Sequence, residues 1–168
     1  LTILHSNDGE SDLLPDGDFK GVARFARTVD DLRAEATQDC VTECGVILLS
    51  SGDNFLAGPE FNASLENGVP FFDAQAQDMI GFDASAIGNH EFDFGPDVLA
   101  DYIESFSMTA PPFLSANLDV SGEPRLSALE GQGRIASSTI IEIPVFGPRS
   151  DHHDDGDDDE RVARIGLI

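Results

Sequence analysis

Short apolar runs alternate with amphipathic stretches along most of this chain, and several of the apolar runs end at small polar residues. Between the runs, apolar residues recur at helical spacing, as in Val22, Phe25, Val29 and Leu32. This alternation of strand and helix predicts an α/β fold with a layered core. Strands are expected over residues 1–4, 45–49, 82–87, 113–118, 139–146 and 162–168, and helices over residues 21–36, 70–80 and 97–106.

Polar residues gather just after the carboxyl ends of three of the predicted strands. Asp8, Asp53 and the pair Asn89-His90 follow these strands. In open α/β sheets this edge is where ligands bind. Asp53 and Asn89 each follow a glycine, which lets the backbone pass close to a neighbouring segment. Glu10 is two residues after Asp8, so an extended backbone would put both side chains on one side.

The side chains at this edge have the chemistry of ligands for hard divalent cations. Carboxylate and amide oxygens from Asp8, Glu10, Asp53 and Asn89 suit Mn²⁺, Mg²⁺ or Ca²⁺. A central aspartate could bridge two metal ions, an arrangement that hydrolyses phosphate esters. Each residue taken singly is better explained as a helix cap or a turn former. The combination at three successive strand ends favours the metal site.

Composition and charge narrow the possible partners. The 168 residues are 40% hydrophobic, enough for one domain with a real core. The net charge is −23 with a single lysine, a surface that repels nucleic acid, so no nucleic acid polymer is expected as partner. A salt-rich environment and an ordinary acidic soluble protein both remain open. No run of 18 apolar residues exists, so no membrane span is expected.

Two local features have more than one interpretation. The acidic segment over residues 150–160 is expected to be a solvated loop rather than a calcium site, because Val162 stands where an EF-hand needs glutamate. Cys40 and Cys44 lack the second pair that a zinc ribbon needs. A small disulfide in an oxidising compartment is the favoured interpretation, and two free thiols are the alternative.

Five sequence blocks occur in an order typical of one enzyme family. They are Leu1-Thr-Ile-Leu-His-Ser-Asn-Asp8, Gly21-Val-Ala-Arg24, Leu49-Ser-Ser-Gly-Asp53-Asn-Phe, Gly88-Asn-His-Glu-Phe-Asp93 and Leu114-Ser-Ala-Asn117. Together they resemble the signature blocks of the 5′-nucleotidase branch of the calcineurin-like metallophosphoesterases. The resemblance implies that residues 1–168 form the N-terminal portion of a four-layer α/β/β/α catalytic domain. The C-terminal substrate-binding domain of that family is expected to be absent from this chain.

The resemblance also implies roles for individual residues. Asp8 would ligate a first metal ion, Asp53 would bridge two ions, and Asn89 would ligate the second. His90 would stabilise charge on the phosphoryl oxygens or assist the leaving group. Asp93 would orient His90, which is physically sensible because a carboxylate on one imidazole nitrogen fixes the tautomer and raises basicity.

The chain departs from the family pattern in two places. Glu10 stands where the family usually has a histidine ligand, which should favour Mn²⁺, Mg²⁺ or Ca²⁺ over Zn²⁺. The family's downstream histidine ligands find no match, since His152 and His153 lie in the acidic segment. The metal site is therefore expected to be incomplete and this chain by itself inactive. The remainder of a longer chain, or a second copy, is expected to complete the fold.

The expected function is hydrolysis of phosphomonoesters, with 5′-nucleotides as the substrate class, at a site with two divalent metal ions. The chain opens directly on a strand without a signal peptide, which fits either a cytosolic protein or a mature, processed one. The resemblance implies the processed form, located in the periplasm or outside the cell. Two alternatives remain open. One is a cyclic-nucleotide phosphodiesterase of the same fold, and the other is a non-catalytic fragment that binds a metal or ligand.

Overall fold

Five short parallel strands form the central sheet in the computed structural model, which describes residues 1–17, 20–38, 40, 44–145 and 162–168. The sheet follows chain order, β1-β2-β3-β4-β5, and β1 pairs with β2 from Thr2 opposite Val46 to Ser6 opposite Ser50. All carboxyl ends therefore meet at one edge. The strands are β1 (Thr2–Ser6), β2 (Val46–Ser50), β3 (Ala84–Ala86), β4 (Phe113–Leu114) and β5 (Ile135–Ala136).

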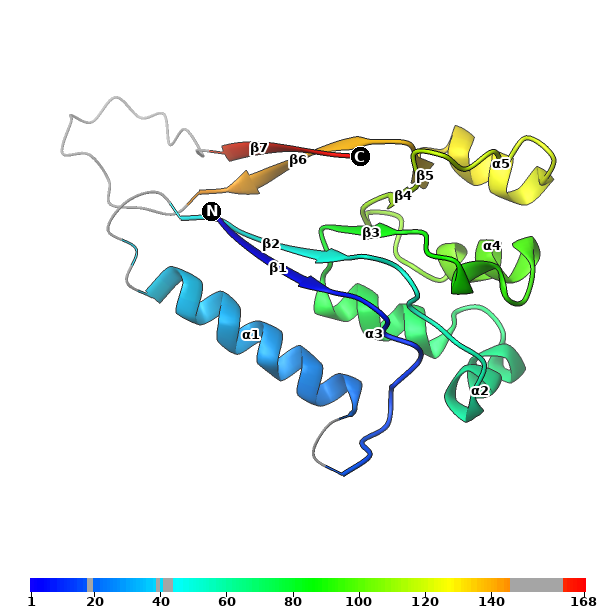
Figure 1. Ribbon diagram of the computed structural model, residues 1–168, viewed down its shortest axis with the longest axis horizontal. Helices are drawn as coiled ribbons and strands as arrows, with labels where there is room; N and C mark the ends of the chain where they lie inside the picture. Colours follow the sequence, from blue (N-terminus) through cyan, green and yellow to red (C-terminus); the bar gives the residue numbers. More distant parts are fainter. Residues whose placement is uncertain (18–19, 39, 41–43, 146–161) are drawn as a thin grey trace.

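Helices connect the parallel strands. Proline begins three of them, at Pro59, Pro96 and Pro124, where its missing N–H costs no helical hydrogen bond. Figure 1 shows α1 and α3 side by side along one face of the sheet, with α4 and α5 beyond its β4–β5 end. The helices are α1 (Val22–Gln38), α2 (Pro59–Asn67), α3 (Phe72–Ile80), α4 (Pro96–Glu104) and α5 (Pro124–Gly131), with a short 3₁₀ helix η1 (His90–Phe92).

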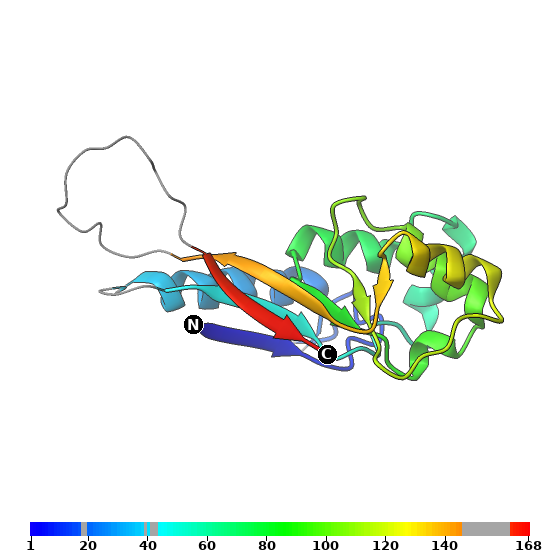
Figure 2. The same cartoon turned by 90° about the horizontal axis from the view of Figure 1, so that it is seen from above.

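A two-stranded antiparallel sheet of β6 (Thr139–Pro144) and β7 (Val162–Leu167) lies over the opposite face of the central sheet (Figures 1 and 2). Ile143 of β6 is buried. It packs against Gly45, just before β2, where an added Cβ would lie 3.3 Å from the Cγ2 atom of Ile143. The layers thus run helix, parallel sheet, second sheet. This arrangement confirms the predicted α/β class.

Aromatic side chains dominate the core on the helical side of the sheet. Phe55 and Phe61 are stacked with ring centroids 4.4 Å apart, and Tyr102 meets Phe55 edge-on at 4.8 Å. All three are fully buried. Burial raises the pKa of Tyr102 well above its ordinary value, and the nearby acidic groups of Glu91 and Asp73 add to the rise. Phe55 directly follows the turn after β2, so the core anchors that turn.

Several predicted boundaries were wrong. The strand expected over residues 113–118 is only Phe113–Leu114, and the strand expected over 82–87 is only Ala84–Ala86. The helices α2 and α5 and the strand β5 were not predicted. Both helices carry proline at their start, a signal that could have revealed them.

The cysteine prediction is confirmed, because Cys40 and Cys44 form a disulfide whose Cα atoms lie 6.1 Å apart. Across the residues that the structure describes, no helix has both the length and the apolar character needed to cross a membrane. The acidic segment over residues 150–160, with His152 and His153, lies outside the described residues.

Candidate active site

The chain segments after β1 and β2 stay hydrogen-bonded beyond the ends of the two strands. The amide of Asp8 donates to the Gly52 carbonyl at 3.3 Å, and the amide of Glu10 donates to the Asp53 carbonyl at 3.0 Å. This backbone pairing holds three of the four predicted metal ligands side by side at the carboxyl edge of the sheet. The side chains of Asp8 and Glu10 are exposed and that of Asp53 is half-buried.

A close backbone contact brings in the turn after β3. A Cβ added at Gly52 would lie 2.6 Å from the Gly88 amide nitrogen, and one added at Gly88 would lie 2.6 Å from the Asp53 amide nitrogen. Gly52 also has a φ of +93°, a backbone conformation that residues with a Cβ atom rarely adopt. The expectation that these glycines let two backbones pass closely is confirmed. The contact places Asn89 and His90 beside Asp53.

The site segments contain an unusual concentration of left-handed backbone. Asp8, Glu10, Ser11 and Asp53 all have φ between +47° and +60°. For residues other than glycine this conformation costs roughly 1–2 kcal/mol each. Such residues persist only where the surrounding structure fixes them, and they cluster at functional sites. Among the described residues, no position outside these two turns combines a side chain with a positive φ.

His90 and Asp93 form the predicted pair. The His90 Nδ1 atom lies 2.7 Å from Asp93 Oδ2, and the side chains are 32% and 37% exposed. The hydrogen bond to Asp93 is the main cause that raises the pKa of His90 above its ordinary value, with smaller contributions from the charges of Asp53 and Glu10. The ring is therefore held by one nitrogen, and the other nitrogen remains for a ligand.

Glu91, whose role the sequence did not reveal, is fully buried between the turns. Its Oε1 atom accepts hydrogen bonds from the Asn54 amide at 2.7 Å and the Asn54 side chain at 3.0 Å. Its Oε2 atom accepts from the amides of Gly88 at 2.7 Å and Asp53 at 3.0 Å. Burial raises the pKa of Glu91, and the donors to its carboxylate oppose that rise. The hydrophobic pattern of the sequence could not have identified Glu91, because a buried acidic residue next to a half-buried histidine follows no apolar or polar periodicity.

The oxygen ligands at this edge are of the type that divalent metal ions prefer, but they do not form a complete coordination site. Asp8, Glu10, Asp53 and Asn89 offer oxygen ligands from one edge of the sheet. The Asn89 side chain is exposed. In the described part of the chain, no three His, Cys, Asp or Glu side chains group closely enough to hold an ion. The ligand assignments therefore remain a proposal.

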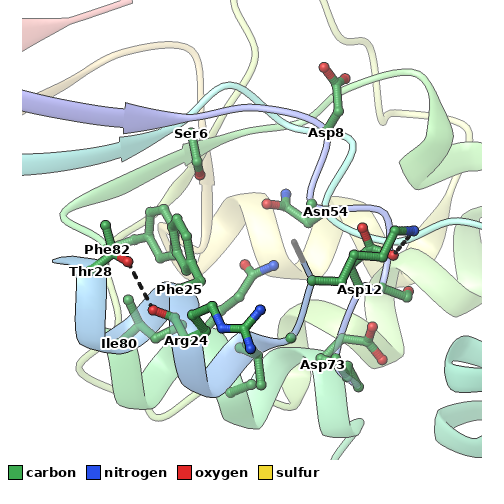
Figure 3. Close-up of a pocket in the computed structure, with 18 of the residues that line it drawn as sticks. Ser6, Asp8, Asp12, Arg24, Phe25, Thr28, Asn54, Asp73, Ile80 and Phe82 are labelled. Atoms are coloured by element: carbon green, nitrogen blue, oxygen red, sulfur yellow. Dashed lines mark hydrogen bonds and ion pairs between the residues drawn. The ribbon is translucent and has the colours of Figure 1, made fainter. Parts of the chain in front are cut away.

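A cavity of about 350 Å³ lies on the helical side of the sheet, between the β1–α1 connection, α1 and α3, and Asp8 is among the residues that line it. Phe25 and Phe82 stack in its wall with centroids 6.2 Å apart, and the Lys20–Asp12 ion pair lies at its rim. Figure 3 shows the Asp8 carboxylate directed away from these aromatic rings. The cavity and the carboxylate edge thus share Asp8, whose carboxylate points away from the aromatic wall of the cavity.

Comparison with known proteins found relatives among nucleotide-processing enzymes, although no family model matches the chain. The chain is 35% identical over 140 residues to a trifunctional nucleotide phosphoesterase from Bacillus subtilis, covering 76% of this chain and 8% of that protein. It is 37% identical over 151 residues to a 5′-nucleotidase from Vibrio vulnificus, covering 88% and 25%. The chain therefore spans a quarter or less of the length of these curated relatives.

Solved structures agree with the sequence relatives. A 5′-nucleotidase precursor from Thermus thermophilus superposes with a TM-score of 0.62 at 31% identity, over 85% of this chain and 26% of that one. The calcineurin-like phosphoesterase YfkN from Bacillus subtilis superposes with a TM-score of 0.64 over 99% and 46%, and at 17% identity it supports the fold only. By sequence and by fold, the chain belongs to the 5′-nucleotidase branch of the calcineurin-like metallophosphoesterases.

Proposed function

We propose that the protein hydrolyses phosphomonoesters, with 5′-nucleotides as the substrate class, at the edge that carries Asp8, Asp53 and His90. The observation that carries the proposal is the convergence of three separate strand ends through backbone contacts. The His90–Asp93 pair at the same edge adds a group able to hold or deliver a proton. The names of the relatives support the substrate class.

Two divalent metal ions would bind at this edge. Asp8 and Glu10 would hold the first ion, Asp53 would bridge, and Asn89 would hold the second. Bound ions would polarise the phosphate and lower the pKa of a coordinated water. Oxygen donors favour Mn²⁺, Mg²⁺ or Ca²⁺ over Zn²⁺. Because the described donors do not form a finished cage, ligands from the rest of the full-length protein, or from a second copy, would complete both coordination shells.

The chain's own groups would orient the substrate and place a proton. The His90 amide donates a hydrogen bond of 2.9 Å to Asp53 Oδ1. This bond orients the carboxylate, and its Oδ2 atom would remain available to a metal ion. Asp93 binds His90 through Nδ1, which leaves Nε2 to donate to a phosphoryl oxygen or to the leaving group. The raised pKa of His90 keeps a proton on the ring to higher pH. Charge on the phosphoryl oxygens would then be met by a donor already in place.

A location in the periplasm or outside the cell is part of the proposal. The Cys40–Cys44 disulfide supports it, because disulfides persist in oxidising compartments. A second candidate activity is hydrolysis of cyclic nucleotides. The relative from Bacillus subtilis supports this alternative, since its name describes a trifunctional nucleotide phosphoesterase rather than a 5′-nucleotidase alone.

The test is hydrolysis by the full-length protein with added Mn²⁺. Three substrates separate the candidates: a 5′-nucleotide, a cyclic nucleotide and a phosphomonoester without a nucleoside. We expect metal-dependent release of phosphate from the 5′-nucleotide. Asp53→Asn should abolish it, and His90→Ala should lower kcat by about a hundredfold while bound metal stays in place. Asp31→Asn, an exposed carboxylate on α1, is the matched control.

Three results would change the proposal. Turnover of the cyclic nucleotide alone would replace phosphomonoester hydrolysis with the phosphodiesterase. Metal binding without turnover of any substrate would favour a non-catalytic metal-binding protein. Loss of bound metal in the His90→Ala variant would mean that His90 is a ligand rather than a proton donor.

A further inference from the structure

Glu91 and His90 are adjacent in η1, but their side chains lie in opposite environments. The His90 side chain is 32% exposed beside Asp93, while Glu91 is 0% exposed. A buried carboxylate is costly unless hydrogen bonds stabilise its charge. Here it receives them from the two turns that carry Asp53 and Asn89. The carboxylate of Glu91 thus accepts hydrogen bonds from the backbone around the site and does not face the substrate.

The hydrogen bonds of Glu91 join segments that are distant in sequence. Three of its four donors are backbone amides, those of Asp53, Asn54 and Gly88. The bond from the His90 amide to Asp53 Oδ1 runs in the opposite direction between the same two segments. Asp53 is therefore fixed at both ends, through its own amide by Glu91 and through its carboxylate by His90. We call the clasp this set of hydrogen bonds, namely the four that Glu91 accepts and the one from the His90 amide to Asp53.

The clasp also accounts for the backbone conformation of Asp53, whose φ is +52°. A left-handed aspartate needs surrounding contacts to hold it. Glu91 binds its amide, and the side chain of Asn54, the next residue, bonds Ser50, Ser85 and Glu91. The left-handed conformation of Asp53 thus depends on contacts with a buried group outside the metal site.

We propose that Glu91 is a positioning residue, which sets the direction in which Asp53 and Asn89 present their oxygens to metal ions. This inference rests on the proposed function, since it concerns the same site. Glu91 acts only through the clasp and touches neither ion nor substrate.

Glutamine cannot accept the four hydrogen bonds that Glu91 accepts. Each carboxylate oxygen accepts two hydrogen bonds, and all four partners are N–H donors. A carboxamide has one oxygen and one NH₂ group, so either orientation turns two attractive contacts into donor-against-donor contacts. The substitution Glu91→Gln keeps size and shape, and it changes only the acceptor at one position. It therefore tests the clasp with little disturbance of packing.

The experiment compares Glu91→Gln with Asp73→Asn in the full-length protein. Asp73 is also a buried carboxylate, 1% exposed, but it bonds Ser64 away from the two turns. Free Mn²⁺ is measured by electron paramagnetic resonance at a temperature where each variant is folded. Amide hydrogen exchange is followed for residues 52–54 and 88–90. We expect Glu91→Gln to weaken Mn²⁺ binding at least tenfold and to speed exchange in both turns, while Asp73→Asn changes Mn²⁺ binding less than twofold.

A loss of Mn²⁺ affinity greater than twofold in Glu91→Gln, with faster exchange in both turns, supports the inference. Mn²⁺ binding by Glu91→Gln within twofold of the unsubstituted protein overturns it, whatever the exchange rates. If the unsubstituted protein binds no Mn²⁺, the proposed function fails, and unchanged exchange in Glu91→Gln would then overturn the clasp as well. Should Glu91→Gln not fold, Asn54→Ala removes the side-chain donor to Glu91, together with the bonds of that side chain to Ser50 and Ser85, and leaves the three backbone donors to Glu91 in place. That variant should show a smaller loss of Mn²⁺ affinity, and no loss would overturn the inference.

Discussion

The backbone amide of His90 donates a hydrogen bond of 2.9 Å to the Oδ1 atom of Asp53. The residue proposed to bridge two metal ions and the residue proposed to act on the phosphoryl group are thus joined directly, across 37 positions of sequence. A disturbance of either turn should therefore reach the other.

Replacing Gly88 with alanine should damage the turn after β2 as well as its own. The new Cβ would lie 2.6 Å from the Asp53 amide nitrogen, a contact that backbone atoms must move to relieve. We expect a loss of about 1–3 kcal/mol in the free energy of unfolding, measured with urea. Gly166→Ala on β7 is the control, since nothing lies within 4 Å of its added Cβ. Equal stability of the two variants would contradict the close contact.

The pKa of His90 should depend on Asp93. The Asp93 interaction raises the pKa of His90 in the folded protein. It therefore favours folding below the unfolded pKa of about 6.5, and that contribution is lost as pH rises through the higher folded value. In metal-free protein, an NMR titration of the His90 ring should give a midpoint that falls in Asp93→Asn. Superimposable titrations of both proteins would show that the pair does not govern this proton.

Metal preference should follow Glu10. Because Glu10 offers a charged oxygen instead of an imidazole nitrogen, the full-length protein should work best with Mn²⁺, Mg²⁺ or Ca²⁺. Glu10→His should raise the affinity for Zn²⁺ relative to Mn²⁺ by about tenfold. Competition binding with the two metals measures this ratio. Stoichiometric zinc in protein purified without added metal, with activity indifferent to the other ions, would refute the prediction.

The Cys40–Cys44 disulfide should stabilise the protein modestly. It closes a loop with a sequence separation of 4, so the loss of loop entropy in the unfolded chain amounts to about 2 kcal/mol. Reduction should lower the free energy of unfolding by that amount, and Cys40→Ser with Cys44→Ser should match the reduced protein. Alkylation of both thiols without prior reduction, detected by mass spectrometry, would argue against the disulfide.

The sequence predicted the parts of this fold that depend on local pattern. The helix over α1 and the strand over β2 follow from periodicity, and the gathering of Asp8 and Asp53 follows from parallel strands ending at one edge. The strand β4 was too long in the prediction, because apolar residues beyond Leu114 belong to a loop that packs on the core. Periodicity records burial and not hydrogen bonding, so it cannot find where a strand ends.

The clasp could not be predicted for a different reason. Glu91 is buried because donors from the residue 53–54 turn and from Gly88 converge on it, and that convergence exists only after the sheet forms. In the sequence it is one of many acidic residues in a chain with net charge −23. The disulfide was easier, because two cysteines four positions apart leave few partners to choose from.

The near-contact of Gly52 and Gly88 has a practical consequence for protein engineering. A chimera that exchanges segments with a relative at a junction between residues 55 and 87 would separate the two glycines, whose fit leaves no room for a side chain on either. Recombination libraries should therefore inherit residues 52–54 and 88–91 from the same parent. Among the chimeras that fold, both segments should come from the same parent, even though more than thirty residues separate them in the chain.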